Sequence, residues 1–166
     1  MHRLIIAALL LIAASTGRGA DGVLIRDVFR TMPDSLMPYL TENNRLDLID
    51  FIDAHMEARV RNSLGGTTQM TALTADSLSI SMSDALRLDM LLVQPQGQTA
   101  DSCRVVCLVE TFGVDSISRE STVRYFSLQW QPLAAAPPLS PRDQRRIDSL
   151  KVQTILKWNA EILKED

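Results

Sequence analysis

Histidine is nearly absent from this sequence, because only His2 and His55 among its 166 residues carry an imidazole. His2 lies in an N-terminal segment that we expect to be removed, which leaves one histidine in the mature chain. A single histidine excludes zinc sites built from several histidines and haem ligation by a histidine pair. A serine or cysteine hydrolase that uses histidine as its base would have to use His55.

Glycine and aromatic residues are also scarce, with seven glycines, two tryptophans and 5% aromatic residues in all. One Gly-Gly pair, at the expected end of a helix, gives no loop that could cradle phosphate. No G-x-S-x-G motif is present. Paired-carboxylate catalysis needs no histidine, and it stays open because carboxylates on the predicted sheet could converge. These carboxylates are Asp84, Asp89, Glu110 and Glu120.

The sequence has two cysteines, Cys103 and Cys107, in the stretch CRVVCLVETF, which is typical of a strand. Four residues along a strand span about 13 Å, whereas a disulfide needs Cα atoms within about 7 Å. We therefore expect the two cysteines not to pair with each other but to pack as buried thiols. An intermolecular disulfide, a redox role or a catalytic pair of Cys107 with His55 stays open.

The N-terminus, MHRLIIAALLLIAASTGRGADG, has the form of a secretory signal peptide: Arg3, an apolar run over residues 4–14, then small residues. That run is shorter than the roughly 18 residues that a membrane-spanning helix needs, and no later run is longer. We expect residues 1–20 to be a signal peptide cleaved near residues 17–20. The protein should be exported, either to the periplasm or to the cell exterior, and should have no membrane span.

The mature chain is mildly acidic, with 15 basic and 20 acidic residues after residues 1–20 are removed. A net charge of about −5 without a basic run argues against nucleic acid as a partner. Nearly 150 residues suffice for one domain with its own core, so we expect no cofactor and no stabilising metal or disulfide.

The stretch LIDFIDAHME places Asp50, Asp53 and Glu57 around His55 and suggests a metal or acid/base site. We predict a helix over about residues 45–64, with Asn44 as its N-cap and an end at Gly65-Gly66. On that helix the three carboxylates lie on the water side, with Glu57 four residues before Arg61 as an ion pair. His55 falls among the apolar residues, half-buried, so the apparent cluster lies on two different faces. A shorter helix precedes it, with Leu24, Val28 and Met32 on one side and Pro33 as its end.

After Gly66 the hydrophobic period changes to two. LSISMSDALRLDM predicts a hairpin with one dry and one wet face, turning at Ser83-Asp84-Ala85. Further strands are expected over residues 67–73, 103–112 and 121–130. The 103–112 segment is apolar on both faces, which places it centrally or beneath a second layer. The prediction is an α+β fold in which N-terminal helices pack on a roughly five-stranded antiparallel meander.

The last 34 residues divide into a proline-rich linker, 133–140, and a C-terminal helix, 141–166, after the helix-plus-sheet domain of residues 21–132. Ser140 as N-cap, Pro141 at the first position and Asp143 at the third mark the start of the helix. Its apolar residues occupy one broad half, among them Ile147, Ile155, Trp158 and Ile162. This helix either docks on its own sheet or serves as an arm for a partner.

The block MPDSLMPYLTENNRLDLIDFIDAHMEARVRNSLGG, followed by MTALT, CLVETFG and YFSLQWQ, resembles an uncharacterised family of exported proteins from Bacteroides-like bacteria. The resemblance runs from about Phe29 to Trp130. It implies an exported domain of unknown function and carries over no activity and no catalytic residue.

Two hypotheses on function follow. The first is a non-enzymatic binding or assembly module of the cell envelope, whose partner is an envelope protein, peptide or polymer. It would bind through the sheet or the terminal helix, with Trp130, Trp158, Ile155 and Ile162 as candidate contacts. The second is a small periplasmic hydrolase that uses His55, with or without Cys107, or a carboxylate pair.

Overall fold

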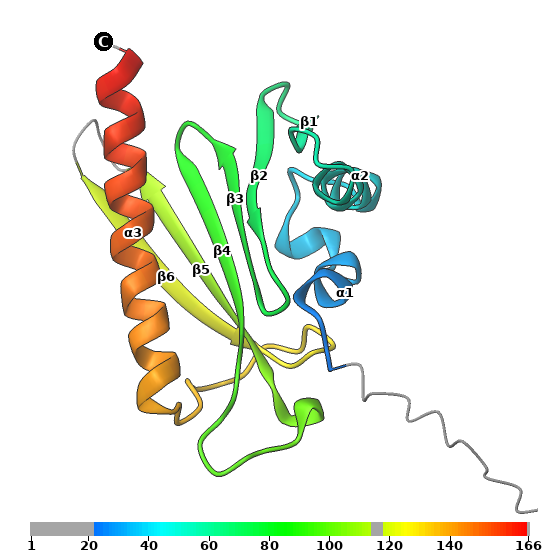
Figure 1. Cartoon of the computed structure of the whole chain (residues 1–166), viewed down its shortest axis with the longest axis vertical. Coiled ribbons are helices and arrows are strands. Elements are labelled where there is room, and N and C mark those ends of the chain that lie inside the picture. Colours follow the sequence, from blue (N-terminus) through cyan, green and yellow to red (C-terminus); the bar gives the residue numbers. More distant parts are fainter. Residues whose placement is uncertain (1–21, 114–117, 166) are drawn as a thin grey trace, which may run out of the picture.

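The chain forms three layers, in which one antiparallel sheet lies between helices on both of its faces (Figure 1). The computed structural model describes residues 22–113 and 118–165. The fold is the predicted α+β arrangement, with six strands where about five were expected. In chain order the elements are α1 (Ile25–Arg30), the 3-10 helix η1 (Asp34–Leu36), α2 (Glu42–Asp53), β1 (Arg59–Arg61), β2 (Thr67–Leu73), β3 (Ser77–Ser83), β4 (Leu86–Val93), the 3-10 helix η2 (Asp101–Cys103), β5 (Val105–Gly113), β6 (Arg119–Phe126) and α3 (Pro141–Glu165).

The sheet is a plain meander in which each strand pairs with the next along the chain, from β1 to β6. The strand predicted over residues 67–73 is confirmed as β2, and the hairpin of β3 and β4 turns where the sequence predicted. In β3 the apolar residues are buried and the serines are partly exposed, which confirms its dry and wet faces. The two later strands differ from their predicted bounds. The strand predicted over residues 103–112 begins at Val105, because Cys103 lies in η2, and the strand predicted over residues 121–130 begins at Arg119 and ends at Phe126.

The helices α1 and α2 cover one face of the sheet and bury the larger core. Ile25, Phe29 and Leu48 are fully buried against the alternate residues of β3, β4 and β5 that face them. Trp130 closes this layer at the end of β6, because its indole N–H donates to the carbonyl of Val28 at 2.9 Å and its ring packs on Phe126. The segment after β6 is thereby fixed to α1.

The C-terminal helix α3 docks on the other face of the chain's own sheet, which decides between the two roles left open by the sequence. Ile147 packs with the residues of β4 and β5 that face away from the first core, including Leu91, Cys107 and Val109. The predicted second layer over residues 103–112 is therefore confirmed. Burial of β4 and β5 on both faces makes this pair the centre of the molecule.

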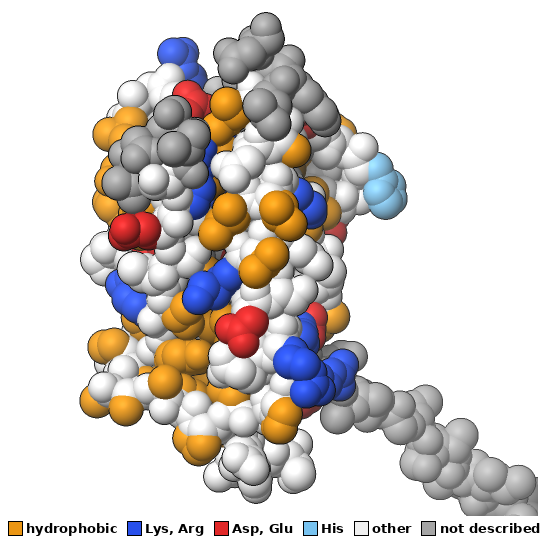
Figure 2. Space-filling view, turned by 90° about the vertical axis from the view of Figure 1, so that its left-hand side faces the viewer, with side chains coloured by type: hydrophobic (Ala, Val, Ile, Leu, Met, Phe, Trp, Pro, Cys, Tyr) orange, Lys and Arg blue, Asp and Glu red, His pale blue; other side chains and the backbone are white. Residues whose placement is uncertain are grey.

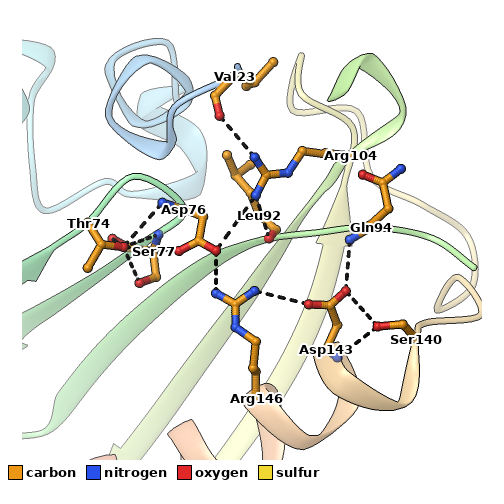
Figure 3. Close-up of polar contacts among 10 residues, drawn as sticks. All are labelled: Val23, Thr74, Asp76, Ser77, Leu92, Gln94, Arg104, Ser140, Asp143 and Arg146. Carbon is orange, nitrogen blue, oxygen red and sulfur yellow. Dashed lines mark hydrogen bonds and ion pairs between the residues drawn. The ribbon is translucent and has the colours of Figure 1, made fainter. Parts of the chain in front are cut away.

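A polar network fixes the first turn of α3 to the sheet (Figure 3). Ser140 caps the helix, because its hydroxyl accepts from the backbone N–H of Asp143 at 3.1 Å, as predicted. Arg146 bridges the carboxylates of Asp143, at 3.2 Å, and Asp76 in the β2–β3 turn, at 2.7 Å. Arg104 reaches from the start of β5 to the carbonyls of Val23 and Leu92. The network joins four distant parts of the chain at one end of the sheet.

The helix predicted over residues 45–64 is wrong in both of its bounds. It begins earlier, because Thr41 and not Asn44 is the N-cap, and Asn44 returns the bond in a capping box. It ends at Asp53, after which the chain turns and Arg59–Arg61 forms the edge strand β1. His55 adopts a left-handed backbone conformation (φ 56°), which is uncommon outside glycine and asparagine and closes the helix here. The glycine pair at residues 65 and 66 lies in the β1–β2 turn.

Two further expectations concern the membrane and export. Within the described ranges, no helix combines the length and apolar character that crossing a bilayer requires. The predicted signal peptide, residues 1–20, lies outside the described residues.

Candidate functional site

A groove with a volume of about 690 Å³ lies between α3 and the strands that α3 leaves uncovered. Its floor is the face of β2, β3 and β4 that carries serine and threonine, and its wall is one side of α3. We call this hollow the polar groove. Its lining residues with a hydroxyl or amide side chain are Thr67, Gln69, Thr71, Ser79, Ser81, Gln153 and Thr154. The wet face of the hairpin, recognised in the sequence from its serines, forms much of this floor.

Asp89 lies in the floor of the polar groove and is 2% exposed. As the sequence predicted, it lies on the serine-bearing face of the hairpin, opposite Ser79, but α3 covers that part of β4 and buries it. Its carboxylate accepts hydrogen bonds from Ser79 on β3 at 2.5 Å and from Thr154 on α3 at 2.8 Å. Burial raises the pKa of Asp89, while these two hydroxyl donors and the charge of Lys157 lower it. The carboxyl is thus a buried hydrogen-bonding centre between the two layers.

Trp158 of α3 lines the wall of the groove, and two arginines pack against its rings. The guanidinium groups of Arg87 and Arg119 each lie 4.4 Å from the centre of a Trp158 ring. A cation at this distance from an indole is favourable. The ring also approaches Gly113 so closely that a Cβ there would stand 3.3 Å from it. Trp158 is 2% exposed, so it packs α3 against the sheet and offers no open ring to a ligand.

Charged side chains of both signs surround the polar groove. Arg87 pairs with Glu161 across the wall at 3.1 Å, and Arg59 pairs with Glu57 at 3.0 Å instead of the predicted pair of Glu57 with Arg61. The groove therefore has no strong field of one sign, which favours an uncharged polar ligand over an anion.

His55 and Cys107, the alternative catalytic pair, are not brought together. His55 follows α2 on one side of the sheet and is exposed, so its predicted half-buried position is wrong. Cys107 faces α3 on the other side of the sheet and is fully buried. Burial raises the pKa of its thiol to about 12, in spite of a hydrogen bond with Tyr125 and the charge of Lys151. A buried, protonated thiol is a poor nucleophile.

The three carboxylates of the LIDFIDAHME stretch, Asp50, Asp53 and Glu57, do not come together either. Asp53 forms an ion pair with Arg26 of α1 at 2.8 Å, whereas Asp50 lies exposed on α2 and Glu57 lies beyond the end of that helix. Among residues 22–113 and 118–165, no group of three or more potential ligands from His, Cys, Asp and Glu could hold a metal ion. Cys103 and Cys107 are both free thiols.

The four residues predicted as binding contacts divide into two pairs. Trp130 and Trp158 are buried, so neither presents a surface. Ile155 and Ile162 are half-buried on α3 and do not line the polar groove. Figure 2 faces the side of the molecule where α3 lies and shows scattered hydrophobic side chains there. The large apolar residues exposed on α3 are Val152, at 57%, and Leu156, at 62%, which the sequence could place on the helix but not on its outer side.

Comparison with known proteins identifies the family. Residues 21–155 match the model of the family "Protein of unknown function (DUF3256)", so the chain belongs to that family. No curated protein matches. Among solved structures, the chain is similar to a domain of an uncharacterised protein from Porphyromonas gingivalis W83, with a TM-score of 0.54 and 24% identity. The match covers 67% of this chain and 54% of that one, so this chain spans about half the length of the solved structure. The likeness concerns the fold alone.

Proposed function

We propose that this member of a family of unknown function is an exported, non-enzymatic binding module of the bacterial cell envelope, and that the polar groove receives its ligand. The observation that carries the proposal is the lining of the groove, where hydroxyl and amide side chains from β2, β3 and α3 surround one hollow. Hydroxyl groups both donate and accept hydrogen bonds, so such a lining suits a ligand that offers both kinds of group.

The ligand that fits this lining best is an extended peptide segment. A peptide backbone presents alternating N–H and C=O groups, which the hydroxyl and amide groups of Thr71, Ser81 and Gln153 match. A glycan is favoured less, because sugar rings pack on open aromatic faces and the groove offers only Trp158, which both arginines cover. The partner is accordingly an envelope protein with an exposed, polar, extended segment.

Export is supported by the sequence of the N-terminus, where Arg3 precedes the apolar run of residues 4–14. The hydrolase alternative has less support from the described residues. It would require a nucleophile and a base within hydrogen-bond reach, whereas His55 and Cys107 lie on opposite sides of the sheet.

The test is selection of peptides from a displayed random library on the immobilised protein, followed by mapping of the bound peptide through amide chemical shifts. We expect the shifts to move in β2, β3 and α3. Ser81→Arg, which fills the groove with a long side chain, should weaken binding at least tenfold. Asn43→Arg adds the same charge on the exposed surface of α2 and serves as the matched control. Equal affinity of both variants for the selected peptides would overturn the proposal.

A further inference from the structure

The sheet has two edges, and only one of them is protected. At one edge, β1 has three residues, which is a common way to prevent pairing with another chain. At the other edge, β6 has eight residues and pairs along its length with β5 alone. Its end is covered, because Phe126 forms a bridge with Pro132 and Tyr125 bonds with Leu133. Among the described residues, no strand lies against the outer side of residues 120–124.

One hydrogen bond shows which residues of β6 direct their backbone N–H and C=O groups away from β5. The carbonyl of Tyr125 accepts from the N–H of Leu133 at 2.9 Å on the side away from β5. In an antiparallel strand, successive residues direct their backbone groups to alternate sides. Val123 and Ser121 therefore also direct their N–H and C=O groups outward. Within the described part of the chain, these outward groups have no backbone partner.

We propose that a second copy of this chain pairs with residues 120–124 of β6, as an antiparallel strand related by a two-fold axis at Thr122. Ser121 then lies opposite Val123 of the second copy, and Val123 lies opposite Ser121 of that copy. Each of these two pairs exchanges two backbone hydrogen bonds. The pairing ends before Tyr125, because Leu133 of the same chain already occupies the outer side of that residue. The result is one continuous sheet of twelve strands.

Charge selects this register among those that the backbone allows. Residues whose backbone groups point away from β5 must face residues of the same kind in the second copy. The two-fold axis must therefore lie at a residue and not between two residues. Centred on Thr122, Glu120 lies opposite Arg124 of the second copy, and the pair occurs twice by symmetry. If the two-fold axis lay at Ser121 or Val123, neither Glu120 nor Arg124 would face a residue of opposite charge. If it lay at Glu120 or Arg124, that residue would face its own copy, and like charges would meet. Opposite charges directly across a strand pair are favourable and like charges are not.

Both charged groups are available for this contact. Glu120 is exposed on β6. Arg124 pairs with Glu110 of its own chain at 2.8 Å, yet its side chain remains 44% exposed. A guanidinium has five N–H donors, so Arg124 can hold Glu110 and the second copy's Glu120 at once. The polar groove lies over β2–β4, away from β6, so the pairing leaves it open and can succeed or fail independently of the proposed ligand.

The first test is a disulfide at the two-fold axis. Directly opposite residues in a pair that exchanges no backbone hydrogen bonds have Cα atoms about 4.5 Å apart, within the range of a disulfide. Thr122→Cys, made together with Cys103→Ser to remove the half-buried thiol, should give a covalent dimer with oxidised glutathione. Glu120→Cys in the same background is the control, because its two copies lie about 13 Å apart along the strands and cannot join. Dimer formation by both variants, or by neither, would contradict the proposed register.

The second test exchanges charges and reads the mass of the protein by sedimentation equilibrium. The native chain should dimerise, whereas Glu120→Arg and Arg124→Glu should each be monomeric because like charges then meet twice. A mixture of these two variants should form a mixed dimer, since every opposed pair is again of opposite charge. A native chain that stays monomeric at millimolar concentration, or a mixture that shows no mixed dimer, would overturn the proposal.

Discussion

The carboxylate of Asp89 on β4 accepts a hydrogen bond from the hydroxyl of Thr154 on α3 at 2.8 Å. This bond joins the sheet to the helix that covers it, at the floor of the polar groove. A buried carboxyl is costly unless hydrogen bonds satisfy it, and Ser79 supplies a second donor from β3. Asp89 thus ties β3, β4 and α3 together at the floor of the proposed ligand site.

The stability of the protein should depend on pH through Asp89. Burial raises its pKa above the ordinary value of 3.8, so the folded chain keeps a proton that the unfolded chain has lost. The stabilisation that Asp89 contributes is fully present below the pKa that Asp89 has in the unfolded chain. It is lost as the pH rises through the higher pKa that Asp89 has in the folded chain. Urea unfolding from about pH 3 to about pH 8 should show the native protein losing stability relative to Asp89→Asn as the pH rises. Asp84→Asn, at an exposed carboxyl, should follow the native curve, and a pH-independent difference for Asp89→Asn would contradict the prediction.

Trp158→Ala should be among the most destabilising changes in α3. The ring is 2% exposed and lies between Arg87 and Arg119, so its removal leaves a cavity and two arginines without their aromatic contact. The expected loss is about 3–5 kcal/mol of unfolding free energy, measured by chemical denaturation. Leu156→Ala is the control on the same helix, because Leu156 is 62% exposed and its loss should cost within about 0.5 kcal/mol. Equal effects of the two changes would mean that α3 does not dock as described.

The sequence predicted the meander well because its signals are local. The alternation of Leu78, Ile80 and Met82 with serines is a period that only a strand satisfies. The end of α2 could not be predicted in this way. Met56 and Val60 continue the helical spacing of Ile52, yet the chain leaves the helix at Ala54. The residue with left-handed backbone there is His55, and no glycine or asparagine marked the position.

The floor of the polar groove shows a second limit of sequence reasoning. Asp89 alternates with apolar residues in β4, which indicates a solvent-facing position. Whether another layer covers that face depends on where α3 docks, about 65 residues later in the chain, as the bond between Asp89 and Thr154 shows. The strand pattern carries no information on that contact. The wet face of the hairpin was visible in the sequence, but the wall that makes it a groove was not.

The N-cap of α3 should contribute measurably to stability. The Ser140 hydroxyl accepts from the N–H of Asp143, which would otherwise be unsatisfied in the first turn. Ser140→Ala should lower the unfolding free energy by about 1 kcal/mol. Ser149→Ala, in the exposed middle of the same helix, should be neutral or slightly stabilising because alanine favours helix. Thermal unfolding of the two variants side by side would distinguish a true cap from a general effect of losing a hydroxyl.

The two cysteines should differ in reactivity. Cys107 is fully buried and the pKa of its thiol is raised to about 12, so almost no thiolate forms near neutral pH. Cys103 lies half-buried in η2. Alkylation with iodoacetamide, followed by mass spectrometry of peptides, should label Cys103 first and Cys107 only after unfolding in urea. Labelling of Cys107 in the folded protein at a rate equal to that of Cys103 would contradict its position beneath α3.

Removal of α3 should unfold the protein and not merely detach a partner. A chain that ends at Pro138 would expose the apolar residues of β4 and β5 that α3 covers, among them Leu91, Val93, Val105 and Val109. Exposed apolar surface of this kind promotes aggregation. We expect this truncated chain to bind the dye ANS and to sediment as aggregates. A monomeric truncated chain with native near-ultraviolet circular dichroism would contradict the role of α3 as a core layer.

The position of α3 after the meander in the chain sets an order of events during folding. The meander pairs neighbours in sequence, so its strands can form early, since local contacts form fastest. The second core waits for Ile147, which follows the last strand of the sheet. Until α3 docks, one side of β4 and β5 has no cover, so the strands at the centre of the molecule are the last to be enclosed on both faces.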